Sequence, residues 1–391
     1  MGFVPPRTRG ETALHPGLTA MARRHRGGTF SAPVLHDLKV PAVTTRRLPA
    51  LVALSALFAA AAVAPAAAQT NTGVAVPTPF SAVYLFGDSL SDGGNNNLVF
   101  GGLTGPNPSS ATFIPSLPYA SAPGQRPTYS NGPVWFNSFA AGLGLGGYAQ
   151  PSLAGGGNYA FGGARTTVDG VGAPPFVPAP FPASLRTQLN GHLATTPVSP
   201  TALYIIAGGG NDARDTAEAV AANPANIVAL TTAGATAYAT ATAQMVGTLR
   251  ANGASNIVVW NVPDLGKSPA ALAGGPSAAG AASFISGAFN SALNTALAGS
   301  GAQIFDLFGL VGSYVANPAA FGFTNVTQAC GFAGNGCDAA TALFWDGIHP
   351  TAYTQGLVST AMLAAVPEAG TVWMFMAGLL ALGVMVKRRR A

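Results

Sequence analysis

Four short apolar runs are the feature that most constrains the fold of this chain. They cover residues 82–86, 202–207, 256–262 and 303–307. None of them alternates apolar with polar residues, as a strand of a half-exposed sheet would. Each run therefore predicts a strand that is buried on both faces, which is typical of parallel sheets covered by helices.

Helices are expected between the later runs. Residues 225–251 carry apolar side chains at helical spacing, and Gly253 is a stop signal after them. A second helix is predicted over 277–298, with Phe284, Phe289, Leu293 and Leu297 near one face. Strands that alternate with helices predict an α/β fold with a parallel sheet.

Polar residues follow two of the expected strands. Ser89 lies in a Gly-Asp-Ser-Leu motif after the first run, and Asn211 follows a run of glycines after the second. In open α/β sheets, sites form at the carboxyl ends of the strands, where a serine can be presented beside backbone N–H groups that stabilise negative charge. Each motif alone also has a plainer interpretation. Ser89 can cap a helix in a polar turn, and Asn211 can belong to a Gly-Asn turn before a helix.

An acid and a histidine stand close together near residue 350. Asp346 and His349 are three residues apart, so the carboxylate can fix the tautomer of the imidazole, which can then take a proton from a serine. Between residues 69 and 366 the only other histidine is His192, which has no acid beside it. We interpret His192 as a core or surface residue, which leaves His349 as the candidate base.

Four segments together resemble the sequence blocks of the SGNH/GDSL hydrolases. In the order of that family, they are residues 87–90, 158–163, 209–212 and 346–350. Residues 129–135, 261–266 and the loop between Cys330 and Cys337 also resemble segments of the family, so the resemblance covers residues 80–366. It implies a three-layer αβα, flavodoxin-like fold with a mostly parallel central sheet.

The resemblance also implies roles for individual residues in ester hydrolysis. Ser89 would be the nucleophile, His349 the base and Asp346 the residue that orients it. The oxyanion would be bound by the N–H groups of Ser89 and Gly163 and by the side chain of Asn211, with Gly162 as the alternative to Gly163. This chemistry needs no metal and no organic cofactor.

Two other motifs are weighed and set aside. Residues 142–147 match the dinucleotide pattern G-x-G-x-x-G, but the preceding residues 135–141 predict a helix rather than the required strand. The G-x-S-x-G motif of ordinary α/β-hydrolases is missing from the sequence.

The N-terminal residues 1–68 resemble an extended signal peptide. Arg46 and Arg47 precede an apolar run over 48–64, and small residues follow up to an expected cleavage after Ala68. A membrane anchor is the alternative. Because a signal peptide usually spans about 15–30 residues, we expect translation to start near Val40 or Val43.

The C-terminal residues 367–391 resemble a PEP-CTERM sorting signal. Pro367-Glu368-Ala369 precedes an apolar segment over 371–386 and a terminal basic cluster, although the family has proline where Ala369 stands. The expectation is transient membrane anchoring and recognition by a sorting protease. A plain tail anchor is the alternative.

The charge of the domain bears on whether it binds nucleic acid, and the cysteine content bears on whether it forms a disulfide. Residues 69–366 contain six Lys or Arg against ten Asp or Glu, so the expected domain over 80–366 offers no electrostatic footprint for nucleic acid. Two cysteines in an exported chain predict a disulfide between Cys330 and Cys337 rather than a metal site.

Together these features predict an exported carboxylesterase or lipase that is periplasmic, outer-surface or secreted. A phospholipase and a polysaccharide acetylesterase use the same chemistry, and a surface-retained binding protein without turnover is the rival from another class. Loops such as residues 103–126 are expected to wall the substrate pocket and set the acyl-chain length. The sequence leaves the oligomeric state open.

Overall fold

The central sheet of the computed structural model is parallel, as the apolar runs predicted. It contains β1 (Val83–Gly87), β2 (Leu203–Ala207), β3 (Asn256–Trp260) and β4 (Gln303–Phe305), paired side by side in that order. The structure describes residues 80–109, 113–172 and 180–366. The predicted signal peptide and sorting tail lie outside these ranges.

A further segment extends the sheet beyond β1. The N–H of Leu85 donates to the carbonyl of Gly157 at 3.0 Å, and the N–H of Tyr159 donates to the carbonyl of Leu85 at 2.8 Å. With residues 157–161 counted as a strand, the sheet has the order 2-1-3-4-5 of flavodoxin-like folds. In such sheets, ligands bind at the carboxyl ends of the strands where the order reverses, which here lies between β1 and β2.

Helices connect the strands. In chain order they are α1 (Asn95–Val99), α2 (Trp135–Gly142), α3 (Leu185–Thr195), α4 (Gly210–Ala222), α5 (Ile227–Ala251), α6 (Pro269–Ala273), α7 (Gly275–Leu297), α8 (Leu307–Ala316) and α9 (Ala352–Ala365). The helix expected over 135–141 is present as α2 and follows no strand, so the glycine-rich residues 142–147 lack the context of a dinucleotide-binding loop.

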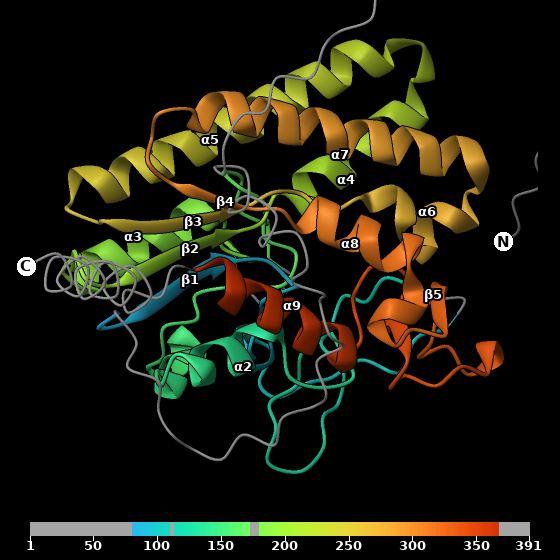
Figure 1. The fold of residues 1–391 in the computed structure, drawn as a ribbon, viewed down its shortest axis with the longest axis horizontal. Coiled ribbons are helices and arrows are strands. Elements are labelled where there is room, and N and C mark those ends of the chain that lie inside the picture. Colours follow the sequence, from blue (N-terminus) through green and yellow to red (C-terminus); the bar gives the residue numbers. More distant parts are fainter. Residues whose placement is uncertain (1–79, 110–112, 173–179, 367–391) are drawn as a thin grey trace, which may run out of the picture. The chain divides into compact units, whose positions relative to one another are not determined.

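The helices form a layer on each face of the sheet (Figure 1). On one face α2, α8 and α9 pack against Val83 and Leu85 of β1. On the other face α3, α4, α5 and α7 pack against Phe86 of β1 and Ile206 of β2. Because successive strand residues point to opposite faces, both sets of apolar side chains are buried. The three-layer αβα prediction is thus confirmed.

Two details differ from the sequence expectations. Phe284 and Phe289 are predicted near one face of their helix, yet Phe284 is 48% exposed, whereas Phe289 is fully buried. Most other residues of α7 are Ala, Gly or Ser, so hydrophobic spacing alone does not mark which face is covered. The run over 303–307 is also split, because Asp306 caps α8 by accepting the N–H of Gly309.

A small second sheet precedes the segment that holds Asp346. Strands β5 (Asn325–Ala329) and β6 (Ala342–Phe344) pair in parallel, and the loop between them contains both cysteines. Strand β6 therefore ends two residues before Asp346.

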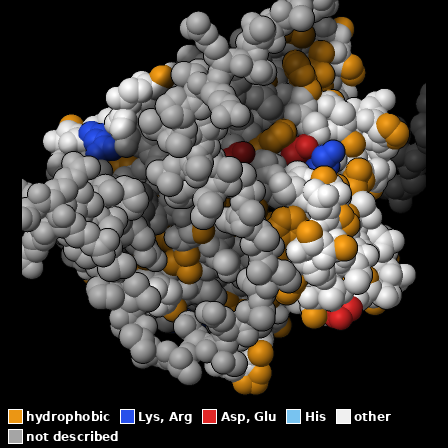
Figure 2. All heavy atoms as spheres, viewed as in Figure 1, with side chains coloured by type: hydrophobic (Ala, Val, Ile, Leu, Met, Phe, Trp, Pro, Cys, Tyr) orange, Lys and Arg blue, Asp and Glu red, His pale blue; other side chains and the backbone are white. Residues whose placement is uncertain are grey.

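Within the described residues, none of the helices combines the length and the hydropathy needed to cross a membrane. On the face drawn in Figure 2, the charged side chains that are visible are few and scattered rather than gathered into a basic patch.

Candidate active site

Ser89 lies directly beyond the carboxyl end of β1. Gln188 of α3 fixes this strand end, because its side chain accepts the N–H of Gly87 at 2.8 Å and donates to the carbonyl of Gly87 at 2.9 Å. Asp88 then closes a tight turn by accepting the N–H of Leu90 at 3.0 Å. Ser89 is 8% exposed, so its hydroxyl is held at a buried sheet edge. Gln188 carries no motif that would have marked it in the sequence.

The hydroxyl of Ser89 meets His349 from the far end of the chain. The Ser89 Oγ lies 2.8 Å from His349 Nε2, and His349 Nδ1 lies 2.7 Å from Asp346 Oδ2. With Asp346 ionised, Nδ1 donates to the carboxylate and Nε2 is left to accept the serine proton. The structure therefore brings these three predicted site residues into one hydrogen-bonded row.

A tight turn holds Asp346 and His349 in this geometry. The N–H of Trp345 donates to the carbonyl of His349 at 2.8 Å, and Asp346 Oδ1 accepts the N–H groups of Ile348 and His349 at 2.8 and 2.7 Å. The spacing of three residues is thus explained by a side chain that bonds its own following backbone. Asp346 and His349 are 0% and 2% exposed.

The N–H groups of Gly162 and Gly163, the two candidate oxyanion donors, differ in their hydrogen bonds. The N–H of Gly162 already donates to Asp92 Oδ2 at 2.9 Å and to Asn96 Oδ1 at 3.1 Å. By contrast, no oxygen within the described ranges accepts a hydrogen bond from the N–H of Gly163 or of Ser89. Gly163 also has a φ of 81°, in the left-handed region that favours glycine.

Asn211 lies beside the same backbone segment. Its side-chain amide donates to the carbonyl of Ala164 at 2.9 Å, which leaves its second N–H for another acceptor. Gly209 precedes α4 with a φ of 103°, and a Cβ there would lie 2.3 Å from the ring of Tyr238. The glycines therefore allow the close approach that positions Asn211 beyond β2.

Asp92 contacts Gly162 and Tyr119 contacts Asp346, although the sequence indicated a role for neither Asp92 nor Tyr119. Asp92 is 1% exposed and accepts the N–H groups of Gly94, Asn95 and Asn96 as well as that of Gly162. Tyr119 donates its hydroxyl to Asp346 Oδ2 at 2.8 Å. Asp92 lies two residues after the Gly-Asp-Ser-Leu motif, whereas nothing in the sequence around Tyr119 marks it.

Two buried titratable side chains, Asp88 and His192, lie outside the hydrogen-bonded row of Ser89, His349 and Asp346, and burial shifts the pKa of each. Asp88 lines the pocket beside Ser89, and burial raises the pKa of its carboxyl to about 6. His192 is buried on α3 away from this pocket, with Nδ1 3.2 Å from the Tyr159 hydroxyl. Burial lowers the pKa of His192 to about 4. It is therefore a neutral core histidine at pH 7, in line with its interpretation from the sequence.

A predominantly apolar pocket opens from Ser89 and His349. Its inner wall comes from α8, β6, α9 and the turn after Asp346, and consists of Leu307, Val311, Leu343, Phe344, Ile348, Pro350 and Val358. Its polar lining residues include Asn211, Arg214 and Asp264. The expectation that residues 103–126 wall this pocket is not met by the described part of that loop.

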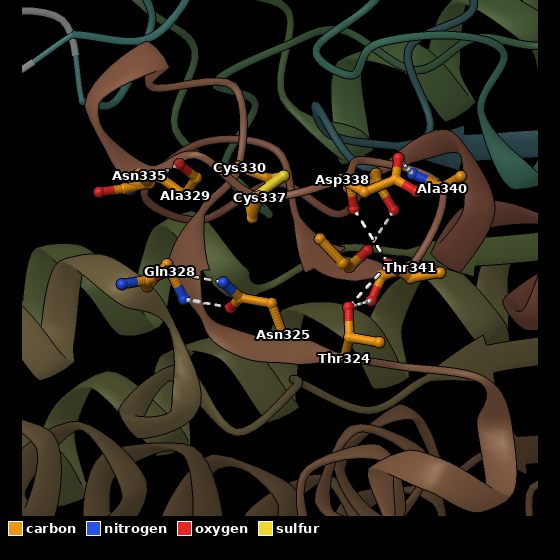
Figure 3. The surroundings of a disulfide bond; sticks show 12 residues. Thr324, Asn325, Gln328, Ala329, Cys330, Asn335, Cys337, Asp338, Ala340 and Thr341 are labelled. Carbon is orange, nitrogen blue, oxygen red and sulfur yellow. Dashed lines mark hydrogen bonds between the residues drawn. A yellow bond between two sulfur atoms is a disulfide. The ribbon is translucent and has the colours of Figure 1, made fainter.

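Cys330 and Cys337 form a disulfide with Cα atoms 5.4 Å apart (Figure 3). The loop that they close is attached to the segment before Asp346. The N–H of Cys330 donates to the carbonyl of Phe344 at 3.0 Å, and the N–H of Gly331 donates to the carbonyl of Trp345 at 2.8 Å. The cross-link therefore restrains a loop that is bonded to the site's own backbone.

In the described part of the chain, His, Cys, Asp and Glu side chains form no group of three or more that could hold a metal ion. That the chemistry needs no cofactor stays a prediction.

The sequence and fold of the chain are similar to those of known proteins. Residues 83–362 match the family model of the GDSL-like lipases and acylhydrolases. The chain is 32% identical over 329 residues to proteins named Esterase EstA from Pseudomonas aeruginosa and from Pseudomonas putida, and each match covers 73% of this chain and 46% of the relative. The chain thus spans about half the length of these curated relatives.

Among solved structures, phospholipase A1 from Streptomyces albidoflavus is 16% identical with a TM-score of 0.39, and the match covers 74% of this chain and 100% of that one. The family model matches well over half of the chain. The chain therefore belongs to the family of GDSL-like lipases and acylhydrolases.

Proposed function

We propose that this chain is an exported serine carboxylesterase or lipase that hydrolyses acyl esters through an acyl-enzyme on Ser89. The observation that carries the proposal is the buried row in which the Ser89 hydroxyl contacts His349 at 2.8 Å and His349 contacts Asp346 at 2.7 Å. This arrangement activates a serine, because the imidazole accepts the hydroxyl proton while the carboxylate stabilises the imidazolium.

The reaction has two halves. Ser89 Oγ attacks the ester carbonyl as His349 Nε2 takes its proton, and His349 then returns that proton to the departing alcohol. Water, deprotonated by His349, then attacks the acyl-enzyme; the bond between the acyl group and Ser89 Oγ breaks, His349 returns the proton to Ser89 Oγ, and the acid is released. In both halves the oxyanion accepts hydrogen bonds from the N–H groups of Ser89 and Gly163 and from the side chain of Asn211. One such donor contributes about 3 kcal/mol to the stability of the transition state.

The pocket supports an ester with an apolar acyl group. The pocket that contains Ser89 is lined by Leu307 and Val311 of α8 and by Leu343 and Phe344 of β6. An alkyl chain in this pocket leaves water for apolar surface, which stabilises binding by about 0.8 kcal/mol for each buried methylene. This favours carboxylesterase or lipase activity over deacetylation of a polysaccharide. A phospholipase also binds an apolar acyl chain, so it differs from a carboxylesterase or lipase only in the alcohol group of its substrate.

Export is supported by the disulfide between Cys330 and Cys337, since such cross-links persist in oxidising compartments. We propose that residues 1–68 direct export and that residues 367–391 anchor the protein transiently in a membrane until a sorting protease acts on them. Fractionation of cells that express the full chain tests this. Recovery of the protein from the cytoplasm alone, with residues 1–68 still attached, would contradict it.

Labelling with a fluorophosphonate probe tests the enzymatic proposal, because only an activated serine reacts. The wild-type protein should be labelled and should hydrolyse a short-chain nitrophenyl ester. Ser89→Ala should lose both properties and keep its melting temperature. Ser291→Ala, which changes an exposed serine of α7, is the matched control and should keep both. Full activity of Ser89→Ala would remove the assignment, and a wild type without labelling or turnover would favour a binding protein.

A further inference from the structure

The carboxylate of Asp346 has all of its acceptor positions occupied. Oδ1 accepts the N–H groups of Ile348 and His349, while Oδ2 accepts His349 Nδ1 at 2.7 Å and the Tyr119 hydroxyl at 2.8 Å. An ionised carboxylate offers about four lone-pair sites, so these donors satisfy it fully. Asp346 is 0% exposed, so protein groups rather than solvent satisfy its carboxylate.

Tyr119 is the only one of these donors that lies outside the turn 346–349. Its position is set by its own loop, because the N–H of Tyr119 donates to the carbonyl of Thr128 at 2.8 Å. Its ring meets Trp345 edge-on, with the centroids 6.1 Å apart. The side chain is 1% exposed, so the hydroxyl is fixed against the carboxylate from a segment 227 residues away in sequence.

Tyr119 stays a proton donor throughout the working range of the site. Burial raises the pKa of its hydroxyl, and the negative charge of Asp346 raises it further. The hydroxyl therefore does not ionise, and its hydrogen bond to Oδ2 runs from neutral phenol to carboxylate, which is the stronger, charge-assisted kind.

We propose that Tyr119 is a positioning residue for ester hydrolysis, acting through Asp346; this inference rests on the proposed function of the row. Tyr119 holds Oδ2 in line with His349 Nδ1 and keeps the carboxylate satisfied while the imidazolium forms. It does not line the substrate pocket. Its contribution therefore appears in the chemical steps rather than in substrate binding.

Tyr119→Phe tests the proposal, because it removes the hydroxyl and keeps the ring. The kcat for a short-chain nitrophenyl ester should fall about ten- to hundredfold, which is the range of a hydrogen bond to a buried charge, while KM stays unchanged. Tyr204→Phe is the matched control. Tyr204 is equally buried, but its hydroxyl accepts the N–H of Ser199 at 2.8 Å, beside the amino end of β2, and kcat should stay unchanged.

A double-mutant cycle separates positioning from general packing. In an Asp346→Ala background the partner of Tyr119 is gone, so adding Tyr119→Phe should change the residual kcat less than about twofold. An equal fractional loss in both backgrounds, or a change in KM alone, would overturn the inference. An unchanged kcat in the single variant would do the same. If Ser89→Ala stays active, the proposed function fails; if Ser89→Ala is inactive while Tyr119→Phe is normal, only this inference fails.

Discussion

Asp92 Oδ2 accepts the backbone N–H of Gly162 at 2.9 Å, although 70 residues separate the two in sequence. This contact ties the loop after β1 to the segment that precedes Gly163. Because the N–H of Gly162 is engaged, the peptide that follows presents the N–H of Gly163 instead. The carboxylate of Asp92 thereby occupies the N–H of Gly162 and leaves the N–H of Gly163 as the candidate donor to an oxyanion.

Asp92→Asn should lower kcat about tenfold with little change in KM. The amide places N–H groups where the carboxylate accepted backbone N–H groups, so the loop before Gly163 loses its anchor, and a misplaced donor weakens transition-state stabilisation rather than ground-state binding. Steady-state kinetics on a nitrophenyl ester measure this. Asp338→Asn, at an exposed turn where Oδ1 accepts the N–H of Ala340, is the control and should be unchanged. A wild-type kcat in Asp92→Asn would show that the loop needs no such anchor.

Asn211→Ala should lower kcat by about 10²-fold and raise KM much less. The side chain already donates one N–H to the carbonyl of Ala164, and the second N–H is the group expected to reach the oxyanion in the transition state. Rates should be compared at saturating substrate with Asn252→Ala, where an exposed amide donates only to Thr248 at the end of α5. If kcat is the same in Asn211→Ala as in wild type, Asn211 is no oxyanion donor.

Val311→Trp should shorten the acyl chains that the protein accepts. Val311 lies on the wall that α8 contributes to the apolar pocket, and an indole there should fill part of the space proposed for the acyl chain. Because each buried methylene contributes about 0.8 kcal/mol, excluding two methylenes lowers kcat/KM for an octanoate ester about tenfold. The acetate ester should be hydrolysed as before.

The control for this change is Val228→Trp, at a 66% exposed position of α5. It should leave the whole chain-length profile unaltered. A parallel loss for acetate and octanoate in Val311→Trp would point to a disturbed site rather than a blocked pocket. An unchanged octanoate rate would place the acyl group elsewhere.

The strands and the residues at their carboxyl ends were predictable from sequence, because unbroken apolar runs and the geometry of parallel sheets are both local or general rules. The contacts that support the site were not. Tyr119 reaches Asp346 across 227 residues, and Gln188 reaches Gly87 across 101, from segments without any motif. Such contacts depend on how loops pack, which propensity and periodicity do not encode.

The prediction of which side of α7 is buried failed for a different reason. A helix built mainly from Ala, Gly and Ser has weak contrast between its sides, so Phe284 looked equivalent to Phe289. The lining of the pocket was not predicted from sequence either: much of it lies on α8, β6 and α9, and the described residues of 103–126 are not part of it. Nothing in the local sequence of β6 or α9 shows that a space remains between them and α8.

His192 should make the protein less stable in mild acid. The imidazole is fully buried, and burial lowers its pKa from 6.5 to about 4 in the folded state. Below pH 6.5 His192 therefore binds a proton in the unfolded chain but not in the folded chain. The free energy of unfolding falls accordingly as the pH drops from about 6.5 towards 4. Between pH 7.5 and pH 5 this loss amounts to about 2 kcal/mol of unfolding free energy.

Urea unfolding of wild type and His192→Phe at these two pH values isolates the effect. Burial raises the pKa of Asp88 and Asp92 to about 6, so those carboxyls gain stability on acidification and oppose His192. They are present in both proteins, and the difference between the two pH dependences cancels them. His192→Phe should therefore lose about 2 kcal/mol less than wild type between pH 7.5 and pH 5. Equal losses in the two proteins would mean that the unfolded and folded states protonate His192 alike, which its burial among Tyr84, Tyr159 and Tyr204 argues against.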